Sequence, residues 1–271
     1  MSNLIHQPCG DCGSSDALQI NIAENGAVKS TFCHSCGQYT AASDGYSPVE
    51  IPEPSEPKPK PDFSSVERML TTANYQAIVS RGLNTATAKT YGILEKPDKT
   101  YFSYHDPEDA NVPIAAKIRL PDKNFYNVGN WSGAGLFGQQ LFNGGGKYIT
   151  LCEGEFDAAA AYQMQGSKYA CVSVRNGAGG ALKDCKAAYE YLDSFEAIII
   201  CFDADEPGNK ASKEVAELFS GKAAIVKHTG GHKDACDYLI ANDIKGFTAA
   251  FWAAEKFVPD GIINGASLWD E

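Results

Sequence analysis

Two short segments, YITLCEGE at residues 148–155 and AIIICFDAD at residues 197–205, decide how we interpret the fold of this chain. Each is an apolar run with β-branched residues, which is typical of a strand buried on both faces of a parallel sheet. Each run ends abruptly in carboxylates. Because ligands gather at the carboxyl ends of the strands in open α/β sheets, Glu153, Asp203 and Asp205 fall where a site is expected.

The two aspartates after the second run have the spacing of a cation site. Asp203 and Asp205 are separated by one residue, which places both carboxylates on the same side of an extended backbone. Carboxylates this close repel each other unless a cation lies between them, and Mg²⁺ often binds through one or two carboxylates plus substrate phosphates. The alternative is a solvated turn over residues 203–208, because Asp, Pro and Gly all favour turns.

The segments around these carboxylates alternate between helical and strand-like patterns. Between the two runs lie a helical run, a strand-like run at residues 169–174, a Gly-rich turn and a second helical run. After Asp205 come a helical run, a strand-like run at residues 223–227 and a Lys-Asp pair. This alternation predicts a parallel α/β sheet with the carboxylates at its edge, which favours a site over a solvated turn.

These residues resemble a known family. EGE at residues 153–155, DAD at residues 203–205 and KD at residues 233–234 are similar in type and order to the TOPRIM domain of primases and topoisomerases. The resemblance implies that one or two catalytic Mg²⁺ ions are bound by Glu153, Asp203 and Asp205, with Asp234 as a further acidic residue of the catalytic site. A general-base role for Glu153 is an alternative to metal binding.

Residues 1–43 contain two Cys-x-x-Cys pairs separated by 20 residues, which is the spacing of a zinc ribbon. Four thiolates in a closed tetrahedral site suit one structural Zn²⁺ ion. Strand-like pieces at residues 18–22 and 28–32 flank an Asn-Gly hairpin signal, and so small a unit depends on the metal for much of its folding energy. Redox dithiols or disulfides are the alternative, which a reducing compartment disfavours. The predicted zinc ligands are Cys9, Cys12, Cys33 and Cys36.

A linker and a second unit connect the cysteine region to the carboxylate region. Residues 44–62 contain six prolines among charged and small residues, which predicts a semi-extended linker. Residues 63–146 begin with a helical pattern at residues 64–80 and then become strand-like. Residues 147–245 are the predicted TOPRIM domain, and residues 246–271 contain a predicted C-terminal helix and, by resemblance to primases that are fused to a helicase, the start of the helicase connector. The predicted fold class is therefore α/β (α+β): a small zinc ribbon, a Pro-rich linker, a mixed subdomain and a parallel TOPRIM domain.

Three cations form a candidate basic strip in the second unit. Lys117 and Arg119 lie on one face of a predicted strand, and Lys123 follows it. A solvated sheet edge is the alternative, since lysine commonly protects such edges. Beside an acidic metal site, however, a basic strip is what a triphosphate substrate requires. We therefore expect these three residues to bind nucleoside triphosphate or template.

The order of motifs along the chain is similar to the primase half of the primase-helicases of T7-like phages. Besides the cysteine pairs and the TOPRIM segments, the shared motifs are RGL at residues 81–83, KIR at 117–119, KNF at 123–125, LFG at 136–138 and NGG at 143–145. Bacterial DnaG primases share this plan but usually have one histidine among the zinc ligands. No G-x-x-x-x-G-K-[ST] segment is present, which predicts that the helicase lies outside this chain.

This resemblance implies an activity and partners. The reaction is template-directed synthesis of short RNA primers from ribonucleoside triphosphates on single-stranded DNA, with the zinc ribbon helping to recognise the template. The implied protein partners are a replicative helicase, fused or separate, and a DNA polymerase.

Composition bounds the location and the strength of template binding. The 271-residue chain has a net charge of −11, so we expect template binding that is weak without metal, nucleotide or partners, and sensitive to salt. No run approaches the ~18 apolar residues of a membrane helix, and the N-terminus lacks the basic and apolar regions of a signal peptide. We therefore expect a cytoplasmic protein, in the host cell if a phage encodes it, without a membrane partner.

Three other functions share parts of this pattern. A RecR-like recombination mediator also combines a four-cysteine zinc site with TOPRIM and only binds DNA, but it has no long middle unit and needs no catalytic carboxylates. A TOPRIM nuclease uses the same carboxylates to cut phosphodiesters. A topoisomerase needs a further domain for its tyrosine nucleophile, for which the chain has no room.

Overall fold

The structure is a computed structural model that describes residues 3–10, 17–23, 27–34, 38–41, 63–109, 112–122 and 124–259. By its internal contacts the chain divides into two compact units, Met1–Asp62 and Phe63–Glu271. None of the described helices combines the length and the apolar character that crossing a membrane requires.

The first unit is an antiparallel sheet of short strands. β1 (Asn3–Gln7), β2 (Leu18–Ile22), β3 (Val28–Cys33) and β4 (Tyr39–Ala41) are hydrogen-bonded in that order. The predicted strands at 18–22 and 28–32 are confirmed as β2 and β3. Cys9 follows β1 and Cys33 ends β3, and both side chains are buried. Cys12, Cys36 and the predicted linker lie outside the described residues, so the zinc ribbon stays a prediction.

The second unit begins with two helices and an antiparallel meander. α1 (Phe63–Thr72), the 3-10 turn η1 (Val79–Arg81) and α2 (Thr85–Tyr91) precede β5 (Ile93–Lys96), β6 (Lys99–His105), β7 (Pro113–Arg119) and β8 (Phe125–Gly129). The strands pair in chain order. Two further 3-10 turns, η2 (Trp131–Gly133) and η3 (Gln139–Leu141), lead out of the meander. α1 packs on the sheet through Val66 and Leu70, which share a core cluster with Ile118 of β7.

The predicted helix at residues 64–80 is wrong beyond its first half, because α1 ends at Thr72. The hydroxyls of the last two residues donate to backbone carbonyls one turn back, Thr71 to that of Glu67 (2.9 Å) and Thr72 to that of Arg68 (2.7 Å). Such local bonds compete with continued helix, and β-branched residues lower helix propensity. The apolar residues beyond the helix instead form a short bridge between Ile78 and Leu83.

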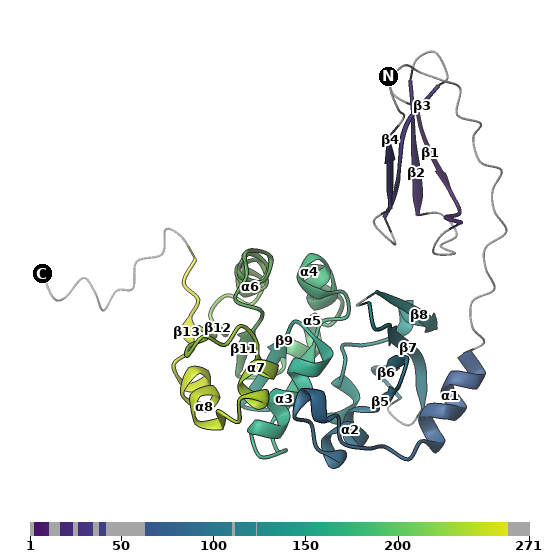
Figure 1. Ribbon diagram of the computed structural model, residues 1–271. Helices are drawn as coiled ribbons and strands as arrows, with labels where there is room; N and C mark the ends of the chain where they lie inside the picture. The colour runs from purple at the N-terminus through teal and green to yellow at the C-terminus, as the bar shows by residue number, and fades with distance from the viewer. Residues whose placement is uncertain are drawn as a thin grey trace, which may run out of the picture. The chain divides into compact units, whose positions relative to one another are not determined.

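The remainder of the second unit is a doubly covered, mostly parallel sheet. Its strands are β9 (Tyr148–Cys152), β10 (Ala170–Ser173), β11 (Ala197–Cys201), β12 (Ala223–Ile225) and the antiparallel edge strand β13 (Glu255–Lys256), in the order β10-β9-β11-β12-β13. The helices are α3 (Glu155–Met164), α4 (Gly177–Ala187), α5 (Tyr189–Asp193), α6 (Glu206–Leu218), α7 (Ala235–Ile240) and α8 (Ile244–Trp252). Figure 1 shows α4 and α6 on one side of this sheet and α3, α7 and α8 on the other.

The central strands β9 and β11 are buried on both faces, as their apolar sequence predicts. Ile149 and Ile198 belong to the cluster beneath α4 and α6, whereas Cys152, Ile199 and Cys201 belong to the cluster beneath α3 and α7. Side chains alternate between the two faces along each strand. The predicted α/β fold is confirmed, and the sheet presents the carboxyl ends of β9 and β11 side by side at one edge.

Candidate active site at the carboxyl edge of the sheet

The carboxylates predicted to be catalytic all follow strands of the parallel sheet. Cys152 and Cys201, the last residues of β9 and β11, are paired in parallel register. Glu153 comes directly after β9, and Asp203 and Asp205 come after β11. Asp234 lies between β12 and α7 and immediately precedes that helix. The topology therefore brings segments from distant parts of the sequence to one edge.

The charges of these carboxylates act on one another. Burial raises the pKa of Asp203 to about 7, with further contributions from the negative charges of Glu153, Asp234 and Asp205 and an opposing one from His228. Burial also raises the pKa of Glu153, although the backbone N–H groups of Ala178 and Asp203 oppose that shift. Carboxyl groups whose pKa is raised by burial and by neighbouring negative charges are typical of cation-binding sites.

Two of the aspartates are also helix caps, which fixes their positions. Asp205 accepts a hydrogen bond from the backbone N–H of Gly208 (2.8 Å) and begins α6. Asp234 accepts one from the backbone N–H of Asp237 (2.7 Å) and begins α7. The two loops are joined, because the backbone N–H of Ala204 donates to the carbonyl of Lys233 (2.8 Å). Each carboxylate is thus held by its own backbone before any ligand arrives.

Glu153 has one paired and one unpaired oxygen. Its Oε1 accepts a hydrogen bond from the backbone N–H of Ala178 at the start of α4 (3.1 Å). Its Oε2 is buried and has no hydrogen-bond partner of normal geometry, although the backbone N–H of Asp203 lies close enough to the carboxylate to act on its pKa. A buried carboxylate oxygen without a partner costs free energy, so such an atom marks a position where a ligand is expected.

The three residues of the predicted basic strip do not share one environment. Lys117 and Arg119 lie on the same strand, β7, and Lys123 lies outside the described residues. Lys117 is only 9% exposed, because its ammonium group donates to Oε1 of Glu155 (2.7 Å) and to the carbonyl of Arg175 (3.0 Å). The hydroxyl of Tyr104 donates to the same Glu155 oxygen (2.7 Å). Lys117 is therefore a buried, fixed cation and not part of a solvated sheet edge.

Arg119 forms a pair with a second arginine. Its guanidinium lies 5.8 Å from the centre of the Phe156 ring, and that of Arg81 lies 4.7 Å from the same ring. Burial lowers the pKa of Arg119, and the positive charge of Arg81 lowers it further. Within the described part of the chain, neither arginine takes part in an ion pair. Glu155 and Asp157 act on the pKa of Arg119 in the opposite direction, but neither forms an ion pair with it. Two neighbouring cations without an ion-pair partner among the described residues form a candidate anion site.

Comparisons with known proteins agree with this arrangement. Residues 150–239 match the family model described as Toprim-like. The chain is 33% identical to the DNA helicase/primase of Enterobacteria phage T3 over 98% of its own length. It is 32% identical to the crystal structure of the primase fragment of the bacteriophage T7 primase-helicase protein, covering 92% of this chain and 99% of that chain with a TM-score of 0.60. The chain belongs to the primase family of T7-like primase-helicases.

A further match in this family includes nucleic acid. A chain in the structure of bacteriophage T7 lagging-strand DNA polymerase interacting with primase domains bound to an RNA/DNA hybrid and dTTP is 35% identical, with a TM-score of 0.60, over 68% of this chain and 94% of that chain. The present chain spans about half of the phage T3 protein, 46% of its length.

Two buried acidic residues next to the candidate site were not predicted from sequence. Asp157 of α3 is 9% exposed and accepts a hydrogen bond from the backbone N–H of Cys236 (3.0 Å). Burial, followed by the charges of Asp234 and Asp203, raises the pKa of Asp157 well above its usual range. Glu155 is buried as the partner of Lys117. The E-x-E-x-D spacing at the end of β9 is the sequence signal that could have identified both residues.

Membership in this family implies metal use, and the donor set fits Mg²⁺. Among the residues that the structure describes, no three Asp, Glu, His or Cys side chains form a preassembled metal cage. Mg²⁺ does not need one, since it usually binds through one or two carboxylates and keeps water and substrate phosphates as its other ligands. The unpaired oxygen of Glu153 and the raised pKa of Asp203 are features of such an open site.

Metal binding at this site is expected to weaken as the pH falls below 7. The pKa of Asp203 is about 7, so below that pH a cation must displace a proton. For one displaced proton the apparent affinity for Mn²⁺ should fall about tenfold per pH unit. Titration calorimetry from pH 5.5 to 8, in two buffers with different ionisation enthalpies, measures both the affinity and the proton release. An affinity that does not vary over this range would contradict the assignment.

Proposed function

We propose that this chain is a DNA primase, a nucleotidyltransferase that synthesises short RNA primers from ribonucleoside triphosphates on a single-stranded DNA template. What supports the proposal most is the carboxylate cluster at the sheet edge, together with a buried lysine and two arginines that form no ion pair with any described residue. These groups occur in a chain whose match covers 99% of the T7 primase fragment.

In the proposed reaction the 3′-hydroxyl of the growing primer attacks the α-phosphate of the incoming nucleotide, and pyrophosphate leaves. One or two Mg²⁺ ions, held by Glu153, Asp203 and Asp205 with Asp234 beside them, would orient the phosphates and neutralise developing charge. The residues of β7 and η1 supply fixed positive charge. Arg81 and Arg119 present two forks that suit phosphate oxygens. Lys117, anchored by Glu155, and Lys123 complete the proposed basic strip.

The arginine pair is expected to contribute mainly to nucleotide affinity. A hydrogen bond to a charged group contributes about 1.5–3 kcal/mol, so Arg81→Ala or Arg119→Ala should each raise the KM for ribonucleotides roughly 10–100-fold. Steady-state primer synthesis at varied nucleotide concentration measures this change. Arg68→Ala is the matched control, because it removes an exposed arginine of α1 and should leave the KM unchanged. A parent-like KM in both site variants would rule out the proposed phosphate contact.

Primer synthesis itself is the test of the proposed function. The protein is mixed with single-stranded DNA of varied sequence, Mg²⁺ and labelled ribonucleotides, with Asp203→Asn in parallel. Template-dependent short RNA that disappears with Asp203→Asn supports the proposal. No RNA with intact DNA binding by both proteins would favour a RecR-like mediator, and cutting of the DNA would favour a TOPRIM nuclease.

The roles of the other parts follow from the same proposal. Residues 1–43 would bind one Zn²⁺ ion through the four predicted cysteines and contact the template, with residues 44–62 as a linker. The phage T3 relative is a DNA helicase/primase, and the phage T7 structure is of a DNA polymerase that interacts with primase domains. We therefore propose a replicative helicase, fused or separate, and a DNA polymerase as partners in the cytoplasm of the host cell.

A further inference from the structure

The loop between β10 and α4 is held by a buried ion pair between Arg175 and Asp184. Asp184, in α4, has a side chain that is 0% exposed, and its Oδ1 accepts from Nη2 (2.9 Å) and Nε (3.2 Å) of Arg175. Its Oδ2 accepts from the backbone N–H groups of Arg175 (2.8 Å) and Asn176 (3.2 Å). One carboxylate therefore binds both the side chain of Arg175 and two successive backbone amides of the loop.

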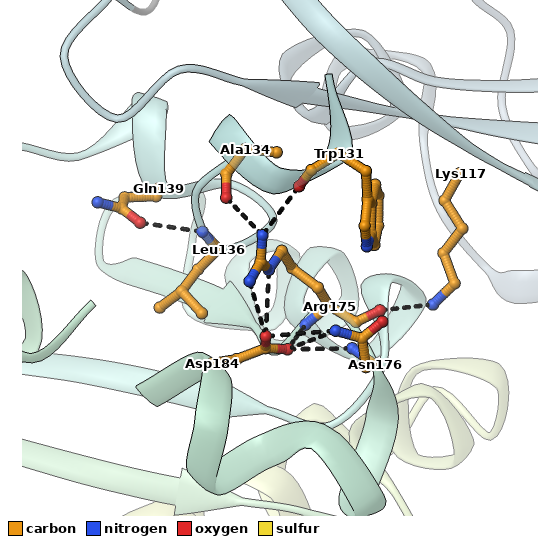
Figure 2. Close-up of polar contacts among 8 residues, drawn as sticks. All are labelled: Lys117, Trp131, Ala134, Leu136, Gln139, Arg175, Asn176 and Asp184. Atoms are coloured by element: carbon orange, nitrogen blue, oxygen red, sulfur yellow. Dashed lines mark hydrogen bonds and ion pairs between the residues drawn. The ribbon is translucent and has the colours of Figure 1, made fainter. Parts of the chain in front are cut away.

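The guanidinium of Arg175 also reaches the antiparallel meander. Its Nη1 donates to the carbonyls of Trp131 (3.1 Å) and Ala134 (2.8 Å), which lie in and after η2. Figure 2 shows Arg175 between these carbonyls and Asp184, with Lys117 directed at the same loop. Arg175 thus links the subdomain that carries the basic strip to the subdomain that carries the carboxylates.

The backbone that this pair holds touches both halves of the proposed site. The carbonyl of Arg175 accepts from the ammonium group of Lys117 (3.0 Å). Three residues later, the backbone N–H of Ala178 donates to Oε1 of Glu153 (3.1 Å). A shift of this loop would therefore move a contact of the buried lysine and a contact of the glutamate together.

A buried ion pair is by itself weak evidence for a stabilising role, because desolvation offsets much of the attraction. Here, however, four hydrogen bonds of the pair involve backbone groups, two in the loop itself and two in the segment at residues 131–134, and together they fix the position of the loop. Residues that orient the ligands of a metal without touching it commonly alter its affinity or the activity.

We propose that Arg175 and Asp184 are positioning residues of the active site, which set the loop at residues 175–178 so that it orients both Glu153 and Lys117. This inference rests on the proposed primase function for its kinetic consequence only. Neither residue is expected to touch the substrate, so the variants should bind metal and nucleotide less well without changing the reaction.

The test uses Arg175→Lys, which keeps the charge but loses the fork, and Asp184→Asn, which keeps the shape but loses the charge. Asp193→Asn is the matched control, since it breaks the half-exposed ion pair with Lys222 (2.9 Å) away from the site. Three quantities are measured well below the melting temperature: Mn²⁺ affinity by titration calorimetry, amide hydrogen exchange of residues 175–178 in metal-free protein, and the kinetics of primer synthesis.

Both site variants are expected to bind Mn²⁺ roughly 10–100-fold more weakly and to have a raised KM for nucleotide. The amide of Ala178 should exchange faster in both, and Asp193→Asn should match the parent. Variants that melt earlier yet keep the Mn²⁺ affinity, the Ala178 exchange and the KM of the parent would overturn the inference, because the pair would then be a purely stabilising contact.

Two further outcomes separate this inference from the proposed function. If the parent makes no RNA, the primase proposal fails, while Mn²⁺ affinity and hydrogen exchange still decide whether the pair positions Glu153. If neither variant folds, the parent alone provides the test: Mn²⁺ should slow the exchange of the Ala178 amide, and exchange unaffected by saturating Mn²⁺ would overturn the inference.

Discussion

An Asp203→Asn variant is expected to lose primer synthesis by about 10³-fold or more, because a metal-assisted phosphoryl transfer depends on several kcal/mol of charge stabilisation. The same substitution should stabilise the metal-free protein at alkaline pH. The pKa of Asp203 is raised from 3.8 to about 7 in the folded chain, so the folded state holds this proton more tightly than the unfolded state does. The stability linked to this group is complete below pH 3.8 and is lost as the pH rises through about 7.

Asparagine carries no charge at any of these pH values, so it removes the repulsion among Asp203, Glu153, Asp205 and Asp234. Because Asp203 is only partly buried, solvent screening reduces the effect to about 1 kcal/mol at pH 8, or ~2–4 °C in the melting temperature. Thermal unfolding in EDTA at pH 8 and pH 5 measures the gain, which should be smaller at pH 5. Asp193→Asn should show neither the activity loss nor the stabilisation. A variant that makes primers at the parental rate would remove Asp203 from the mechanism.

A substitution that abolishes activity but stabilises the fold, as we expect for Asp203→Asn, identifies a residue that is retained for function and not for stability. The cluster at the carboxyl edge combines burial and like charge, which a folded protein otherwise avoids. The unpaired buried oxygen of Glu153 points in the same direction. These unfavourable contributions to folding occur at Glu153, Asp203 and Asp205, the residues that the sequence predicts as site residues because they follow buried strands.

The carboxylates could be predicted because the topology of a parallel sheet dictates where residues after its strands go. Glu153, Asp203 and Asp205 each follow an apolar run, and parallel strands bring such positions to one edge. The environment of Lys117 could not be predicted in this way. Its partner Glu155 is 38 residues away in sequence, and strand spacing gives no information on a contact between a strand of one sheet and the first turn of a distant helix.

Asp157 and the Arg175–Asp184 pair were missed for a related reason. In sequence, Asp157 and Asp184 resemble solvent-exposed helix residues, because a charge on a helix usually faces water. Their burial depends on how α3 packs against the first turn of α7 and how the loop before α4 lies against that helix. The end of α1 also depends on contacts that periodicity does not record, since apolar spacing continues past Thr72.

A Cys33→Ser variant is expected to lose its Zn²⁺ and the sheet of the first unit while the second unit stays folded. The described core of the first unit consists of Ile20, Ile22 and Val28 with Leu18 against them, too little apolar surface to stabilise so small a sheet alone. A structural Zn²⁺ site contributes about 10–16 kcal/mol of apparent binding free energy, so its loss should unfold this unit at all temperatures. The second unit has its own, much larger core and should keep its melting temperature.

Cys185→Ser is the matched control for this experiment, because it makes the same atomic change at a buried cysteine of α4. It should retain one Zn²⁺ per chain and lower only the melting temperature of the second unit. Metal analysis of the parent, Cys33→Ser and Cys185→Ser therefore tests whether zinc is bound by the first unit. Calorimetry of the same three proteins tests whether the remaining thermal transition belongs to the second unit. One Zn²⁺ per chain in Cys33→Ser would contradict a four-cysteine site. Loss of zinc with primer synthesis intact on every template would separate the ribbon from template recognition and leave it a structural role alone.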